Sequence, residues 1–244
     1  MLKQLLAMIG VGLAACAQAE QVQPQARSPY GDPALNAVYN LLFCDSLELF
    51  RAGGEKAGGP WAVLLAEDPR PEALRAIAED AAQESRLRVL AYNRLREKEE
   101  AVPPGKLLGV IVEIALDEGL DVLAAFPDGR VRYINHAGGM SVFEASPPEV
   151  DTQVRRLLAA SQPVVSQIGP WDQARLPPPS RGMVRMTFLV SDGLYFGEGP
   201  QKYMQADPMG GPVVAASLGL LQAVTAADQE ARQAPPGSRL ESTR

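Results

Sequence analysis

The spacing of apolar positions predicts helices towards both ends of the chain and strands in its middle. After Asp32-Pro33, apolar residues recur every three or four positions, as they do on the buried face of a helix. The same period predicts one or two helices over residues 71–98. It predicts another over residues 212–229, which we expect to pack on a sheet because it is short for a membrane span. Ser146-Pro147-Pro148-Glu149 has the spacing of a capping box and predicts the start of a further helix.

Between these helices the apolar period shortens and turn residues become frequent. Pro127-Asp128-Gly129 predicts a tight hairpin, because proline fixes one backbone angle and glycine tolerates a positive φ. Short connections of this kind join antiparallel neighbours. The predicted strands are residues 61–65, 107–116, 120–126, 130–135, 140–145, 183–190 and 194–198. We therefore expect a single α+β domain over residues 32–230, with a mainly antiparallel sheet of about six or seven strands and helices packed against it.

The first residues have the pattern of an export signal. Lys3 precedes an apolar run over residues 5–15, which is too short to span a bilayer. Leu13-Ala14-Ala15-Cys16 resembles the lipobox of bacterial lipoproteins, and this resemblance implies that residues 1–16 form a signal segment with lipidation at Cys16. Ala17 follows the cysteine, which favours the outer membrane over retention in the inner membrane.

Two other interpretations of this segment stay open. Ala17-Gln18-Ala19 is an A-x-A site, so residues 1–19 could instead be a cleaved signal peptide. In the third interpretation the start is mis-assigned, and the protein is cytosolic and begins near Ser28. The polar residues 17–31 are expected to be a tether, and residues 231–244 a disordered tail.

Composition narrows the function classes. Hydrophobic residues make up 46% of the chain, which is enough for a core, and the net charge is −6. An acidic chain lacks the clustered basic surface on which nucleic-acid binding depends, so we expect no nucleic-acid partner. The run RLREKEE, residues 94–100, interleaves bases with acids and is typical of a solvated helix face.

The cysteine count adds a constraint. Cys16 and Cys44 are the two cysteines, so lipidation or removal of Cys16 leaves no internal disulfide. The spacing indicates neither a zinc site nor a cofactor motif, and we expect no cofactor.

Cys44 and His136 are a possible catalytic pair, because a cysteine beside a histidine can be an activated nucleophile. The order of a cysteine on an early helix and a histidine in a following sheet resembles that of NlpC/P60-type cysteine peptidases. The stretch DVLAAFPDGRVRYINHAG is similar to their strand–turn–strand segment, and the resemblance implies a hydrolase. The chain departs from that family at both positions: LLFCDSL places Cys44 after an apolar helix, and no histidine lies on the first strand.

Two other groups could carry function. Carboxylates near predicted turns could act as acids and bases, although turns favour such residues for geometry and solvation alone. These carboxylates are Glu113, Asp117, Glu118, Asp121, Asp192 and Glu198. Aromatic residues near proline and glycine turns could form a binding surface. These aromatic residues are Trp171, Tyr195, Phe196 and Tyr203. In the alternative, Trp171 and Phe196 cover the edge of the sheet.

The sequence thus favours an exported, lipid-anchored α+β protein of the bacterial periplasm that is not an enzyme. It would act as a binding or interaction module for a protein or small ligand of the cell envelope, with the membrane contacted through its N-terminal lipid. The alternatives are a cysteine-dependent hydrolase using Cys44 and His136, and a cytosolic protein with a mis-assigned start.

Overall fold

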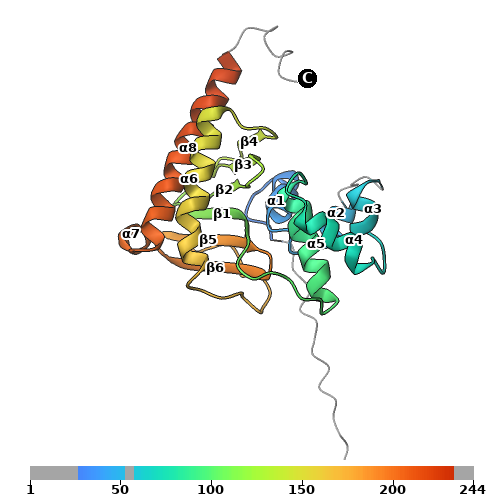
Figure 1. Cartoon of the computed structure of the whole chain (residues 1–244). Helices are drawn as coiled ribbons and strands as arrows, with labels where there is room; N and C mark the ends of the chain where they lie inside the picture. The colour runs from blue at the N-terminus through green and yellow to red at the C-terminus, as the bar shows by residue number, and fades with distance from the viewer. Residues whose placement is uncertain (1–26, 53–57, 234–244) are drawn as a thin grey trace, which may run out of the picture.

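Six antiparallel strands form one sheet, and helices cover both of its faces (Figure 1). This computed structural model describes residues 27–52 and 58–233. The strand order is β4-β3-β2-β1-β5-β6. The strands are β1 (Leu107–Ala115), β2 (Leu120–Ala125), β3 (Val131–Ile134), β4 (Met140–Phe143), β5 (Met183–Val190) and β6 (Gly193–Pro200). The predicted α+β class is confirmed.

The helices lie in two groups on opposite sides of the sheet (Figure 1). Those before the sheet in sequence are α1 (Pro33–Leu42), α2 (Leu47–Ala52), α3 (Pro60–Leu64), α4 (Pro71–Glu79) and α5 (Ser85–Glu97). Those after β4 are α6 (Pro148–Val165), α7 (Gln201–Ala206) and α8 (Gly210–Gln233). The chain crosses from β4 to β5 through α6, and β5 then pairs with β1 at the centre of the sheet.

The alternation of side chains along β1 explains why two cores form. Ile111 faces α1 and α5 and belongs to the first apolar cluster, whereas Val110 and Val112 belong to the second, under α6 and α8. Both faces of the central strand are buried, so its sequence is almost continuously apolar.

The predicted hairpins are present. Between β2 and β3, Gly129 has a φ of 81°, and its N–H donates to the Phe126 carbonyl over 3.0 Å. A glycine fits this left-handed position because it has no Cβ to clash with the backbone. The adjacent Asp128 accepts the N–H of Arg130 over 3.1 Å, which tightens the turn.

Residues 61–65 were expected to form a strand, and the structure corrects this. They lie in and just after α3, which begins with Pro60 in its first turn. Five apolar residues carry too little periodicity to separate a strand from one turn of buried helix, and proline favours the helix start.

The last helix is longer than its apolar pattern predicted. Asp207 accepts the N–H groups of Met209 and Gly210 over 2.9 and 2.6 Å, and α8 extends from Gly210 to Gln233. By length and composition it is the one helix in the described ranges that could cross a membrane. In this fold, its buried positions Val213, Leu220 and Val224 belong to the second core.

Residues 27–31, at the end of the predicted tether, contact the domain. The Tyr30 ring lies edge-on to Tyr39 at 6.1 Å, and its hydroxyl donates to the Leu120 carbonyl over 3.1 Å. Cys16 and the proposed signal segment lie outside the residues that the structure describes.

A carboxylate is buried in the centre of the sheet. Glu113 of β1 is fully buried and accepts a 2.7 Å hydrogen bond from the Tyr39 hydroxyl. Its other oxygen lies 3.7 Å from Nη1 of Arg185, which also binds Glu198 and the Pro177 carbonyl. Burial raises the pKa of Glu113, although the Tyr39 hydrogen bond and the Arg185 charge act in the opposite direction.

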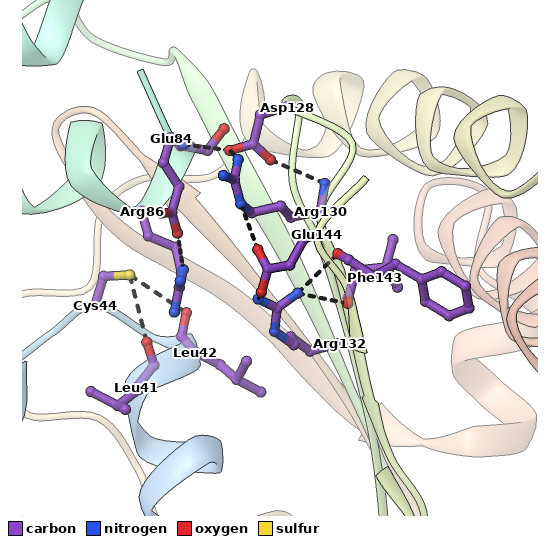
Figure 2. Close-up of polar contacts among 12 residues, drawn as sticks. Leu41, Leu42, Cys44, Glu84, Arg86, Asp128, Arg130, Arg132, Phe143 and Glu144 are labelled. Carbon is purple, nitrogen blue, oxygen red and sulfur yellow. Dashed lines mark hydrogen bonds and ion pairs between the residues drawn. The ribbon is translucent and has the colours of Figure 1, made fainter. Parts of the chain in front are cut away.

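Cys44 occupies a strained turn between α1 and α2. Its φ is 51°, an uncommon conformation for a residue with a side chain. The Asn93 amide holds this turn by donating to the Cys44 carbonyl over 2.6 Å. The thiol is fully buried, 3.7 Å from the carbonyl oxygens of Leu41 and Leu42 (Figure 2), and burial raises its pKa.

The raised pKa of Glu113 predicts a pH-dependent stability difference. Because the folded-state pKa lies above the unfolded one, the folded protein keeps a proton that the unfolded chain loses. The contribution of Glu113 to stability therefore falls as pH rises above about 4.3, the ordinary pKa of glutamate, until the pH passes the folded-state pKa. The variant Glu113→Gln lacks this titration, so its stability relative to the parent should increase above pH 4.3, by at most about 1.4 kcal/mol per pH unit. Urea unfolding of both proteins between pH 4 and 8 measures the difference. The exposed Glu118→Gln should show no such trend; a pH-independent difference for Glu113→Gln would contradict the assignment.

Burial of Cys44 predicts a protected thiol. Iodoacetamide reacts with thiolate, and this thiol is neither accessible nor readily ionised. Mass spectrometry of the Cys44 peptide should show little alkylation of the folded protein at neutral pH and complete alkylation after unfolding in urea. Rapid labelling of the folded protein would show that Cys44 is reactive.

Candidate functional site

A cleft of about 960 Å³ lies between α5, the loop at residues 170–175 and the β5–β6 turn. Its lining residues come from these three segments and from the α1–α2 turn. They are Asp45, Val89, Asn93, Arg96, Glu97, Pro170, Trp171, Asp172, Gln173, Ala174, Arg175, Val190, Asp192, Gly193 and Leu194. Small-molecule sites in proteins have volumes of about 300–1,000 Å³, so the cleft is large enough for such a ligand.

Arg175 joins the loop to the α1–α2 turn. Its Nε donates to Asp45 over 2.6 Å, and its Nη2 donates to Asn40 over 2.9 Å. The guanidinium carbon lies 4.0 Å from the centre of the Phe43 ring, within cation–π range. With 6% and 10% of their side chains exposed, Arg175 and Asp45 form a buried ion pair in one wall of the cleft.

The Arg175–Asp45 ion pair has one donor atom and one acceptor atom that form no hydrogen bond within the described residues. Nη1 of Arg175 and Oδ1 of Asp45 are buried and have no hydrogen-bond partner within the described part of the chain. Such atoms are rare in folded proteins because an unmet donor or acceptor costs free energy. The wall of the cleft formed by Arg175 and Asp45 therefore has unmet hydrogen-bonding groups.

Arg96 is held differently. Its Nη1 donates to the Ser191 carbonyl over 3.2 Å and its Nη2 to the Asn93 side-chain oxygen over 2.9 Å, and both acceptors are neutral. In residues 27–52 and 58–233, no carboxylate forms an ion pair with it. Burial lowers its pKa, whereas the charges of Asp192 and Glu97 raise it. Arg96 is thus a partly desolvated cation without a bonded anion.

Trp171 connects the loop to the edge of the sheet. Its N–H donates to the Leu194 carbonyl over 2.7 Å, which adds an isolated antiparallel bridge to β6. The indole N–H donates to the Ala174 carbonyl over 3.1 Å, and the ring meets Phe196 edge-on at 5.0 Å. Trp171 therefore both covers the β6 edge and lines the cleft.

The four predicted aromatic residues do not form one surface. Tyr195 points to the opposite face of β6 from Phe196, is 4% exposed and donates to Asp192 over 2.9 Å. Tyr203 lies on α7 and is 70% exposed. The structure brings Trp171 and Phe196 together, and of the four only Trp171 lines the cleft.

Cys44 and His136 each have other partners. Nδ1 of His136 lies 2.9 Å from Asp121, which also accepts the His136 backbone N–H over 2.7 Å. The Cys44 thiol contacts main-chain carbonyls instead. No interaction between Cys44 and His136 occurs in the described residues, so the geometry does not assemble a nucleophile and base.

The candidate carboxylates also serve local structure. Asp117 pairs with Arg181, Glu198 with Arg185, and Asp192 accepts the Gly105 N–H over 3.2 Å. Within the described ranges, no three histidine, cysteine, aspartate or glutamate side chains are grouped to hold a metal ion.

A second charged cluster, at the start of α5, contrasts with the cleft (Figure 2). Its members are linked as ion pairs: Glu84, Arg86, Asp128, Arg130, Arg132 and Glu144. Asp128 also accepts the Ser85 N–H over 2.6 Å, and Arg132 donates to the Phe143 carbonyl over 3.0 Å. Because every charge here has an opposite partner, the cluster joins α5 to the β3–β4 hairpin as a structural network.

The polar residues of the cleft could not be identified from the sequence pattern. The pattern RLREKEE is typical of a solvated helix face, but Arg96 within it lines the cleft. Its partners are Asn93, one turn earlier, and Ser191, which only the tertiary fold brings near. A period of three or four residues does not reveal such a contact.

Comparison with known proteins gave no relative from which to transfer a function. No protein-family description matches the chain, and no curated protein or solved structure matches it significantly.

Proposed function

We propose that this chain is a non-enzymatic binding module of the bacterial cell envelope. A lipid on Cys16 holds it at the periplasmic side of the outer membrane, and the polar residues after Cys16 act as a tether between the lipid and the domain. The cleft beside Trp171 binds a protein segment or small ligand. Signal-peptidase cleavage after Ala19 is the alternative route to the same compartment.

The observation that carries the binding role is the unmatched polarity of the cleft. Among the described residues Arg96 has only neutral hydrogen-bond acceptors, and the Arg175–Asp45 pair of the same lining retains an unused donor and acceptor. Trp171 adds an aromatic wall. Ligand sites are typically partly apolar clefts in which a small number of polar groups point toward the ligand.

The catalytic alternative has weaker support. A cysteine nucleophile needs an accessible, ionisable thiol with a base in hydrogen-bond reach. The Cys44 thiol is fully buried, and the histidine that would serve it binds Asp121.

Binding in the cleft predicts that Trp171→Ala removes a bound species and Tyr203→Ala does not. The indole covers one wall of the cleft, whereas Tyr203 lies on α7, outside the lining. Native mass spectrometry of the full chain purified from bacterial envelopes should show an added mass or a captured partner for the parent and for Tyr203→Ala, but not for Trp171→Ala. Circular dichroism should show that both variants fold. Equal retention by Trp171→Ala, or no bound species on the parent, would contradict a binding role for this cleft.

Lipidation predicts a specific mass and location. The chain recovered from a bacterial host should begin at Cys16, carry acyl chains and fractionate with outer membranes, because a lipid-modified N-terminus with more than one chain anchors stably. Cys16→Ser should prevent acylation and membrane retention. Intact mass spectrometry distinguishes the outcomes: a soluble chain starting at Glu20 supports cleavage, and an unprocessed cytosolic chain contradicts export.

A further inference from the structure

The charges that line the cleft restrict its ligand. They comprise two guanidinium groups and four carboxylates: Arg96, Arg175, Asp45, Glu97, Asp172 and Asp192. A polyanion would meet more repulsion than attraction there. A ligand with one anionic group and one cationic group near it would complement both the guanidinium groups and the carboxylates of the lining.

Arg96 is the side chain suited to the anionic group. Arg175 is already neutralised by Asp45 at 2.6 Å, whereas the hydrogen bonds of Arg96 within the described residues go to the Ser191 carbonyl and the Asn93 amide oxygen. A buried or half-buried charge is costly unless an opposite charge joins it. A carboxylate in the cleft would supply that charge and accept hydrogen bonds from the planar guanidinium.

The cationic group has partners at the rim. Glu97 and Asp172 are exposed and line the cleft, and Asp172 forms no ion pair with a basic side chain among the described residues. Among the described residues Glu97 pairs with Arg94 at 3.2 Å, and 59% of the Glu97 side chain is exposed, so the pair is of small energetic value. An ammonium group beside these carboxylates would complete the charge balance.

We propose that the ligand of the cleft is a short zwitterionic peptide whose carboxylate binds Arg96 and whose ammonium group faces Glu97 and Asp172. This inference rests on the proposed binding function. The apolar wall of Val89, Trp171 and Leu194 contacts the rest of the ligand. The Arg175–Asp45 pair also lines the cleft and keeps one unused donor and one unused acceptor, and a peptide unit has one group of each kind.

The test uses the full chain and the dipeptides Ala-Ala, Ala-Leu and Lys-Ala as probes. Isothermal titration measures binding of each dipeptide, of its C-terminal amide and of its N-acetyl form. Trp171 fluorescence is a second readout in a Trp61→Phe background, because Trp61 packs on Phe50 away from the cleft. At least one free dipeptide should bind, and its amide and N-acetyl forms should each bind about tenfold more weakly or worse, the usual value of a charged hydrogen bond.

Arg96→Gln should weaken the free dipeptide about tenfold or more and leave the affinity for its amide nearly unchanged. Arg86→Gln is the matched control on the same helix, since Arg86 pairs with Glu84 and neither residue lines the cleft, and it should bind like the parent. Arg96→Lys, which keeps the charge, should be intermediate. The comparison of dipeptide with amide on the parent stands even if Arg96→Gln does not fold.

Three outcomes would overturn the proposal. No dipeptide binds at millimolar concentration, the amide binds as well as the free dipeptide, or inorganic phosphate competes fully with the dipeptide. The first would leave the binding role intact if native mass spectrometry still shows a species lost by Trp171→Ala. Loss of that species from the parent as well would instead remove the binding function itself.

Discussion

The arrangement of this protein depends on covering both faces of one central strand. β1 is paired with β2 on one side and β5 on the other, and both of its faces are buried. Helices α6 and α8 cover one face. On the other face, α1 and α5 lie over the first core. The loop after α6 contacts β5 and β6 instead: the Pro177 carbonyl accepts a hydrogen bond from Arg185, and Trp171 forms a bridge with Leu194. The cleft lies between these two parts, where the sheet is covered by α5 on one side and by the loop on the other.

The junction between helix and loop is held by polar contacts. Asn93 fixes the strained Cys44 turn, which sets the position of Asp45 and hence of Arg175 on the loop. A left-handed conformation at a residue with a side chain persists only where its surroundings hold it, and such positions cluster at functional sites. The same residue, Asn93, orients Arg96. One amide side chain therefore links the turn, the helix and the cation of the cleft.

Much of the sheet could be predicted from the sequence, and little of the cleft could. Asp128-Gly129 and its counterparts specify local turns, so the strands and their antiparallel pairing follow from neighbouring residues. The short run at 61–65 was assigned wrongly, because five residues do not define a period. Arg96, Asp45 and Arg175 are far apart in the sequence, and each resembles an ordinary surface charge. Trp171 could be identified because aromatic residues near proline and glycine turns are typical of binding surfaces. Its partner Phe196 could not be separated from Tyr195, the adjacent residue on the opposite face.

A comparison of the arginines at the start of α5 with Arg96 shows why the cleft is the better candidate for function. At the start of α5, Arg130 and Arg132 share the carboxylate of Glu144, so their charges are balanced within the fold (Figure 2). Arg96 has a desolvated guanidinium and only neutral acceptors, so it contributes less to folding than a paired charge would. A ligand that binds the folded state alone returns free energy by mass action, about 2.7 kcal/mol at a hundredfold excess over its Kd. An anion on Arg96 would thus offset a cost that the protein bears by itself, and no equivalent gain is available where the arginines are already paired.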